Sequence, residues 1–367
     1  MRKKLEMFVV KLKKYEEKHP VGIILLAALI TLLAVGIVSA CIYVRQVIRM
    51  DSVDYVQFSD KEFEKEVQKL FGKKHFTLTE LESISSLEIE NNNDLSDISD
   101  LVYFSNLTSL SIRYCDISDI SVLSGLDKLS TVNLVGNDVS DLNALSNCDN
   151  LTELYLGNNE ITDITPLYSL SNLTSLMVQQ NNISVLEPGM EQMISLNTIN
   201  VQENRLINID ELAEVENLSY IYASSNKITD TPYLDGMDNL TVLDLGDNAF
   251  QELGDIGNLE NLQELHINNN YLNNLDVLQS CPNLIRLNLS YNEFDNLNGI
   301  EQCQKLQYLD MRGTRINEVS VLSELPEFNT IYVNSDFDRS QLDFMIGNFR
   351  NGDTETKQYL LEKQYNL

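Results

Sequence analysis

Apolar residues recur along this chain with a spacing of 22 residues. Cutting the sequence at Leu151 and its equivalents gives lines such as "LTELYLGNNEITDITPLYSLSN". Ten of the eleven lines from Leu107 onward have this length, and the remaining line, from Leu173, has 23 residues. A partial copy precedes them from Ile84. This self-similarity indicates a stack of structural repeats, because a single unit of this size cannot bury its apolar side chains alone.

Most lines follow the pattern L-x-x-L-x-L-x-x-N-x-[IL], which is typical of leucine-rich repeats. The pattern predicts a short strand over the first places and apolar side chains pointing inward at places 1, 4, 6, 11, 14, 17 and 20. The return segments contain few strong helix formers, so we expect 3₁₀ turns or irregular coil there. The predicted fold is therefore a leucine-rich repeat solenoid of the α/β class, with a parallel sheet on its concave face.

Asparagine occupies the ninth place of most lines, where the strand turns. We expect its amide to bond the backbone of its own turn and of the neighbouring coil, which an irregular path leaves unpaired. The residues are Asn137, Asn159, Asn181, Asn204, Asn226, Asn248, Asn270 and Asn292. Cys115 and Thr314 take this place near the two ends of the stack.

The repeats, about twelve over residues 84–349, are expected to be closed at both ends. Residues 58–83 form a predicted helical N-terminal cap. Its helix is expected to begin at Ser59 or Asp60 and stop at Gly72, and its expected apolar face is Phe63, Val67, Leu70 and Phe71. A second short helical piece is expected over 77–84, and residues 350–367 are expected to form a C-terminal cap or tail.

The 22-residue line, with its "ITDI" turn behind a helical cap, resembles the internalin-type leucine-rich repeat proteins of Gram-positive bacteria. The resemblance covers about residues 55–349 and implies the solenoid fold. No Leu-Pro-x-Thr-Gly signal follows the repeats and no immunoglobulin-like domain follows them. Host-cell invasion, the function of a few internalins, is therefore not implied.

A different pattern occupies the N-terminus. Residues 20–44 contain no charged side chain, which at about 1.5 Å per residue is enough to span about 30 Å of hydrocarbon. Basic residues dominate the preceding segment, so we expect residues 1–19 in the cytoplasm, a transmembrane helix over 20–44, a linker over 45–57 and the repeats outside. "VSAC" ending at Cys41 keeps a second interpretation open, namely a lipoprotein cleaved and lipidated at that cysteine.

Charge narrows the choice of partner. The formal net charge is −29, and residues 1–50 carry nine Lys and Arg against three Glu, which leaves −35 for the remainder. A surface that acidic repels phosphate backbones, so nucleic-acid binding is not expected. The expected partner is a protein, with a glycan as a further possibility. A purely architectural role in the envelope, without a dominant ligand, is the alternative.

The third, fifth and seventh places of each strand are expected to face outward on the concave sheet. Tyrosines and a methionine gather there in four successive repeats, and aromatic patches with a polar border are typical of binding sites. The expected ligand-binding residues are Glu153, Tyr155, Met177, Gln179, Tyr220, Tyr222, Asp244, Glu264 and His266.

Chemistry-bearing motifs are weak. The three histidines His19, His75 and His266 are far apart in the sequence, and no phosphate loop or nucleophile motif is present. Asp119, Asp141, Asp163 and Asp230 share the thirteenth place, where turn capping is the favoured interpretation and loose Ca²⁺ binding the alternative. We therefore expect no enzymatic activity, no catalytic or metal site and no cofactor.

Three cysteines, Cys148, Cys281 and Cys303, occupy the twentieth place, where leucine is usual. They are expected to be small buried apolar residues. Cys281 and Cys303 are one repeat apart, and whether they pair is left open by the sequence.

Overall fold

The computed structural model describes residues 54–335 and 337. The chain forms two compact units, of which the first comprises residues 1–56 and 75–78 and the second comprises 57–74 and 79–367. The predicted segments 1–19 and 20–44, Cys41, His19 and residues 350–367 lie outside the described residues. Within those residues, no helix combines the length and the apolar character that crossing a membrane requires.

The described part of the first unit brings two short segments together through an isolated β-bridge. Tyr55 and Thr77 form an antiparallel bridge, and the backbone N–H of Val56 donates to the carbonyl of Phe76 at 2.8 Å. The Tyr55 and His75 rings lie 5.3 Å apart, so that histidine takes part in a ring contact.

The second unit begins with the helical cap. Helix α3 (Lys61–Phe71) has Asp60 as its N-cap, whose carboxylate accepts the N–H of Phe63, and ends at Gly72 with φ 62°. Helix α4 spans Leu78–Glu82. Phe63 and Val67 are buried as expected, but Leu70 and Phe71 are exposed, so the predicted apolar face was too wide.

The cap helix is held to the first full repeat turn by one buried carboxylate. Asp100, which is 1% exposed, accepts the backbone N–H groups of Ser59 and Asp60 and the Ser59 hydroxyl. Charge-assisted hydrogen bonds of this kind are stronger than neutral ones. Asp60 therefore begins the helix, and Ser59 joins the cap to the repeats.

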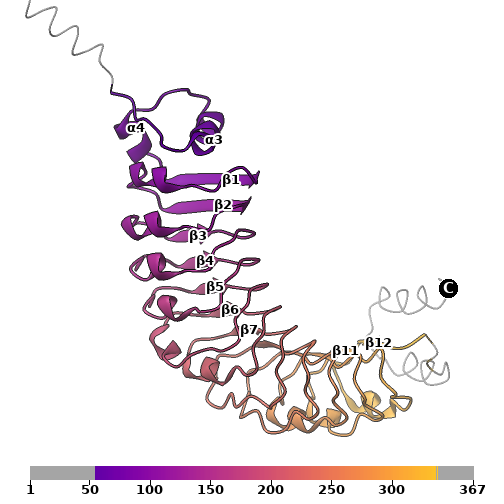
Figure 1. Ribbon diagram of the computed structural model, residues 1–367. Coiled ribbons are helices and arrows are strands. Elements are labelled where there is room, and N and C mark those ends of the chain that lie inside the picture. Colours follow the sequence, from indigo (N-terminus) through magenta and orange to yellow (C-terminus); the bar gives the residue numbers. More distant parts are fainter. Residues whose placement is uncertain (1–53, 336, 338–367) are drawn as a thin grey trace, which may run out of the picture. The chain divides into compact units, whose positions relative to one another are not determined.

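Twelve parallel strands follow in sequence order and form one sheet (Figure 1). Equivalent places of neighbouring repeats are paired, as in Glu153 with Ser175, which confirms the repeat register. The strands are β1 Ser86–Asn92, β2 Ser109–Cys115, β3 Thr131–Asn133, β4 Glu153–Tyr155, β5 Ser175–Met177, β6 Thr198–Asn200, β7 Tyr220–Tyr222, β8 Val242–Asp244, β9 Glu264–His266, β10 Arg286–Asn288, β11 Tyr308–Asp310 and β12 Thr330–Tyr332.

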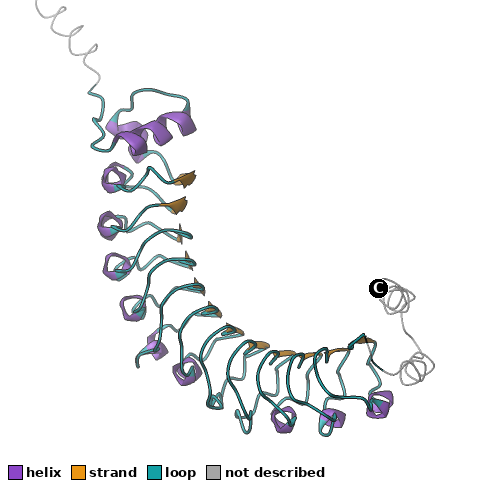
Figure 2. Cartoon of the chain, turned by 45° about the vertical axis from the view of Figure 1, so that its right-hand side comes forward, coloured by secondary structure: helices purple, strands orange, loops and turns teal. Residues whose placement is uncertain are grey.

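Most of the return segments contain one short 3₁₀ turn. Within the second unit they lie on the outer side of the curved stack, and the strands lie on its inner side (Figure 2). The turns are η1 Ser99–Tyr103, η2 Ser121–Gly125, η3 Asn143–Leu145, η4 Thr165–Leu167, η5 Met190–Gln192, η6 Asp210–Glu214, η7 Asp276–Ser280, η8 Ile300–Gln302 and η9 Ser320–Glu324. The predicted 3₁₀ or irregular convex side is confirmed.

The core is a continuous column of the predicted inward places. In the line from Leu151, all seven of these side chains are at most 2% exposed. Each repeat covers the apolar surface of its neighbour, and this burial stabilises the fold by roughly 25 cal/mol for each Å² of apolar surface removed from water.

The ninth-place asparagines form the predicted ladder. The Asn159 amide donates to the carbonyls of Leu156 and Gly157 in its own turn and of Leu134 in the preceding repeat, at 2.9–3.2 Å. Its carbonyl oxygen accepts the N–H of Val139 at 2.9 Å. At the C-terminal end of the ladder, Thr314 satisfies only the carbonyl of Met311 through its hydroxyl.

The eighth place, just before the ladder, adopts the left-handed conformation in eleven repeats in a row, which the sequence pattern did not reveal. Only two of these residues are glycine, Gly136 and Gly313, and the other φ values lie between 51° and 58°. This conformation costs non-glycine residues about 1–2 kcal/mol. The pair Asn158–Asn159 thus serves two purposes, a left-handed turn and a ladder rung.

The thirteenth-place carboxylates confirm the turn-capping interpretation in three of four repeats. Asp119, Asp141 and Asp163 each accept, at 2.8 Å, the N–H of the first residue of the following 3₁₀ turn. Backbone hydrogen bonding lowers the pKa of Asp119 below its usual value. The interpretation was wrong for Asp230, whose repeat has no 3₁₀ turn to cap; its carboxylate accepts from the Thr229 hydroxyl instead.

The three twentieth-place cysteines are buried free thiols, as expected. Cys303 Sγ lies 3.8 Å from the carbonyl oxygen of Cys281, and the two residues form no disulfide. Burial raises the pKa of both thiols to about 12.

Removing one rung of the ladder is expected to destabilise the stack. Asn181→Ala deletes three donated bonds and one accepted bond. The Ile161 N–H is left without an acceptor, whereas the carbonyls of Leu156, Val178 and Gln179 each keep one other donor. An unsatisfied buried group costs about 1–3 kcal/mol and each lost bond about 0.5–1.5 kcal/mol, so we expect a loss of about 3 kcal/mol in urea unfolding of the full chain. The exposed Asn147→Ala is the control, with less than about 0.5 kcal/mol. Equal effects of the two substitutions would contradict the structural role of the ladder.

The buried thiols are expected to resist alkylation. Only the thiolate reacts, and a pKa of about 12 leaves Cys281 and Cys303 protonated near pH 8. Peptide mass spectrometry after iodoacetamide treatment should show both unlabelled in the native chain and labelled in denaturant. Rapid native labelling, or a mass showing a disulfide, would count against this arrangement.

Candidate functional site

All nine predicted site residues lie on outward places of the sheet or directly after its strands. Glu153 and Tyr155 belong to β4, Met177 to β5, Tyr220 and Tyr222 to β7, Asp244 to β8, and Glu264 and His266 to β9; Gln179 follows β5. The strand register sets Tyr155 beside Met177 and Tyr222 between Asn200 and Asp244. They therefore form one row along the six neighbouring strands β4 to β9, of which β6 contributes none of the nine residues.

The row is less exposed than the sequence indicated. Among its large side chains, Tyr220 alone is exposed, at 38%, whereas Tyr155, Met177 and Tyr222 are partly buried. These three side chains lie at outward places, as expected, but they are partly covered because outward side chains of adjacent strands lie side by side.

Hydrogen bonds and burial raise the pKa of two tyrosines in this row. The Tyr155 hydroxyl donates to the Glu153 carboxylate at 2.9 Å, and this bond is the main cause of the raised pKa of Tyr155. The pKa of Tyr222 is raised chiefly by burial. Both hydroxyls thus keep their proton, which Tyr155 donates to Glu153.

Strands β5, β6 and β7 carry no charged side chain at their outward places. We call this surface the neutral band; it comprises Ser175, Met177, Gln179, Thr198, Asn200, Gln202, Tyr220, Tyr222 and Ser224. Glu153 lies on one side of it and Asp244 on the other. In a chain with a net charge of −29, an uncharged band of this width distinguishes one part of the concave face.

Gln202 ties the neutral band together. Its Nε2 donates to Ser224 Oγ at 2.6 Å and to Asp244 Oδ2 at 2.9 Å, and its Oε1 accepts from Asn200 Nδ2 at 3.1 Å. These bonds join β6, β7 and β8 through side chains. Polar groups held in this way lose little conformational entropy when a ligand binds.

A second cluster, at the C-terminal end of the sheet, was missed in the sequence. The Arg286 guanidinium lies 5.6 Å from the centre of the Tyr308 ring, and that of Arg312 lies 5.3 Å from the Tyr332 ring. The two rings are 5.2 Å apart. A guanidinium therefore lies against each of two neighbouring rings.

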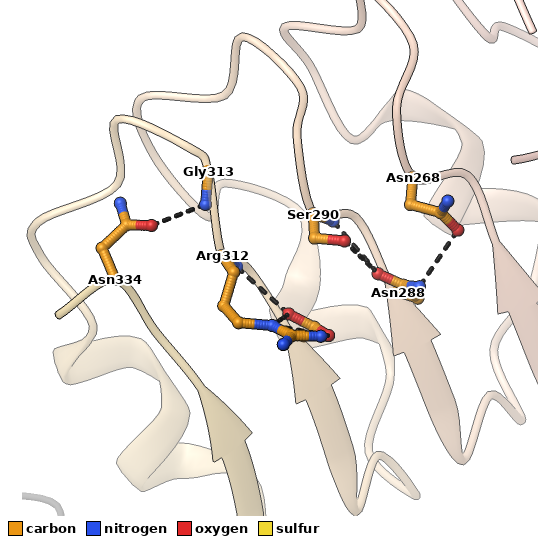
Figure 3. A network of polar contacts seen from close by, with 7 residues as sticks. Asn268, Asn288, Ser290, Arg312, Gly313 and Asn334 are labelled. Atoms are coloured by element: carbon orange, nitrogen blue, oxygen red, sulfur yellow. Dashed lines mark hydrogen bonds and ion pairs between the residues drawn. The ribbon is translucent and has the colours of Figure 1, made fainter. Parts of the chain in front are cut away.

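Carboxylates balance these two arginines. Arg286 Nε is 3.4 Å from Glu264 Oε1, and Arg312 binds Asp310 through two nitrogens, with Nε 2.9 Å from Oδ1. Figure 3 shows the same end of the sheet, where Asn288 bonds to Asn268 and Ser290, and Asn334 accepts the N–H of Gly313. His266 Nε2 lies 3.7 Å from Glu264 Oε2. The only feature of the sequence that indicates this cluster is the presence of Arg286 and Arg312 at outward places, in a chain with far fewer basic than acidic residues.

An acidic groove of about 880 Å³ lies away from the strands. It is formed by the segments after β7, β8, β9 and β10, and Asp230, Glu252, Tyr271 and Glu293 contribute to its lining. Across the described residues, no group of three or more His, Cys, Asp or Glu side chains is placed to hold a metal ion.

Comparisons with known proteins identify the repeats directly. Residues 131–169 and 149–188 match the model for leucine-rich repeats in two copies, and residues 171–228 and 260–316 match a leucine-rich repeat model. A search of curated proteins finds no match.

Solved structures with the same fold include bacterial and plant proteins. An internalin (inlF) from Listeria monocytogenes is 23% identical with a TM-score of 0.65, over 81% of this chain and 94% of that one. The functional domain of InlJ from the same organism is 20% identical with a TM-score of 0.57, over 79% and 75%. The plant peptide hormone receptor RGFR1, in complex with RGF2, is 19% identical with a TM-score of 0.54, over 69% and 48%. The chain contains leucine-rich repeats arranged as a solenoid with internalin-like structural neighbours.

Proposed function

We propose that this leucine-rich repeat chain is a single-pass membrane protein that presents its repeats outside the cytoplasm and binds a partner protein on its concave face. The observation that carries the binding role is the neutral band, an uncharged surface with tyrosines on a strongly acidic chain. The apolar segment 20–44 behind a basic N-terminus carries the membrane role. A binding role in a related fold is named for the plant receptor, of whose length this chain spans about half.

The composition of the neutral band supports a protein ligand. Tyrosine offers a large rigid surface and a hydroxyl, and it is enriched where a few residues supply most of the binding energy. Tyr220 and Tyr222 stand on one strand, and Met177, whose side chain adapts to irregular surfaces, lies two strands away. Glu153 and Asp244 at the borders supply a polar rim.

The acidic remainder of the chain supports the choice of partner. Long-range repulsion disfavours an anionic partner, while the band itself offers no charge for a salt bridge. The partner surface that fits is neutral at its centre and neutral or basic at its edges.

Truncating the tyrosines is expected to abolish binding without unfolding the chain. In Tyr155→Ala, Tyr220→Ala and Tyr222→Ala combined, pull-down of the partner by the full chain should fall at least about 30-fold, since one hot-spot residue contributes about 2 kcal/mol. The control combines Tyr233→Ala and Tyr271→Ala, which remove exposed tyrosines outside the strands. Unchanged capture by the triple variant, at unchanged Tm, would discard the concave site and leave the architectural role.

Membrane topology is testable on intact cells. Protease added outside should remove the repeats and leave the segment before residue 45, and survival of the repeats would contradict the outward orientation. A fatty-acid probe distinguishes the anchor from the lipoprotein alternative: we expect the same label in the wild-type chain and in Cys41→Ser. Label that depends on Cys41 would replace the transmembrane anchor with a lipid anchor.

A further inference from the structure

The fifth and seventh places of each repeat are linked through one backbone N–H. Where the fifth residue is Asn or Asp, its side-chain oxygen accepts the N–H of the residue two places later. We call such strands capped. The capped strands are β3 (Asn133 to Val135, 3.2 Å), β6 (Asn200 to Gln202, 2.9 Å), β8 (Asp244 to Gly246, 3.0 Å), β10 (Asn288 to Ser290, 3.2 Å) and β11 (Asp310 to Arg312, 3.1 Å).

Strands β4, β5, β7 and β9 lack this cap, and we call these four strands open. Their fifth residues are Tyr155 on β4, Met177 on β5, Tyr222 on β7 and His266 on β9. The seventh-place N–H groups of these repeats donate to no residue in the described part of the chain. They belong to Gly157, Gln179, Ser224 and Asn268.

The asparagine ladder explains why these donors have no partner. A regular parallel ladder would offer the seventh-place N–H the sixth-place carbonyl of the preceding repeat. Leu134 and Leu156, which hold that position for β4 and β5, each accept from two ladder asparagines instead. The seventh-place N–H is thus available unless the fifth residue caps it.

The two neighbouring open strands β4 and β5 also hold an acceptor without a partner. The Gln179 amide lies over Gly157, where an added Cβ would be 2.7 Å from Gln179 Nε2. Gln179 Oε1 is buried and accepts no hydrogen bond. Because an unsatisfied buried group is costly, a ligand that offers a donor and an acceptor together recovers that cost.

We propose that β4 and β5 bind an extended, uncharged segment of a partner polypeptide through its main chain. When the Gln179 side chain turns off Gly157, carbonyl oxygens of the segment accept from the N–H groups of Gly157 and Gln179, and one of its N–H groups donates to Gln179 Oε1. Its side chains lie against Tyr155 and Met177. This inference rests on the proposed concave-face binding and names the group that is recognised.

A peptide group fits this site because it carries one donor and one acceptor in a fixed geometry. Met177 and Gln179 belong to the neutral band, and β4 carries only Glu153 as a charge, already bonded to Tyr155. A charged ligand segment would gain no counter-ion there and would lose hydration. An uncharged segment loses the least hydration free energy when it binds there.

The structure supplies a substitution that closes the donor with few other changes. Met177→Asn places at β5 the residue that caps β3, β6 and β10, whereas Met177→Leu keeps an apolar side chain and leaves the N–H open. In the full chain, hydrogen exchange at the Gln179 amide should be at least about tenfold slower in Met177→Asn than in wild type, and unchanged in Met177→Leu. A wild-type Gln179 amide already exchanging as slowly as the capped Gln202 amide would overturn the proposal.

Binding is then tested with a displayed library of random linear peptides selected on the wild-type chain. We expect uncharged sequences whose affinity falls at least tenfold for Met177→Asn and less than threefold for Met177→Leu. Replacing a backbone amide of a selected peptide by an ester removes its N–H, and this should weaken binding to wild type about tenfold at the one position that donates to Gln179 Oε1 and less than threefold at the others. Failure to select any peptide would overturn main-chain recognition.

The two proposals fail in different ways. Peptides that lose binding to the Tyr155, Tyr220 and Tyr222 triple variant but bind Met177→Asn as tightly as wild type would retain the concave site and discard the backbone contacts. Peptides that bind the triple variant as tightly as wild type would discard the concave site itself.

Discussion

The side-chain amide of one asparagine per repeat is the interaction on which this structure depends. As the chain leaves the sheet, backbone N–H and carbonyl groups of each repeat lack partners within that repeat. Asn159 supplies them: its amide donates to carbonyls in two neighbouring repeats, and its oxygen accepts an N–H of the preceding repeat. The residue before each rung adopts a left-handed conformation that non-glycine residues disfavour, and the same conformation recurs at Tyr114 and Gly313, which precede Cys115 and Thr314.

The same ladder shapes the chemistry of the concave face. By occupying the sixth-place carbonyls, it releases the seventh-place N–H groups from the sheet. The fifth residue then decides what each strand presents: an Asn or Asp caps the N–H, as in Asn200, while Tyr155 or Met177 leaves it available. A structural requirement of the fold thereby becomes a variable property of the surface, set by one residue per repeat.

Much of this arrangement could be predicted because the repeat is periodic. The inward places, the ladder and the row from Tyr155 to His266 follow from counting positions, since equivalent residues of a solenoid lie side by side. Contacts that depend on the identity of neighbouring side chains could not be predicted by counting positions. The partial burial of Tyr222 and the stacking of Arg286 on Tyr308 arise from the identity of residues one repeat away. Asp230 caps no turn and bonds to the neighbouring Thr229.

The sequence by itself determined the number and length of the repeats, the core positions, the acidic charge and the apolar N-terminal segment. These properties are written in composition and period, which do not depend on detailed geometry. Only the tertiary structure decided which backbone amides remain open and that Gln179 lies over Gly157 with an unpaired oxygen. Hydrogen bonds require distances and angles between atoms of different coils, and those exist only once the coils are stacked.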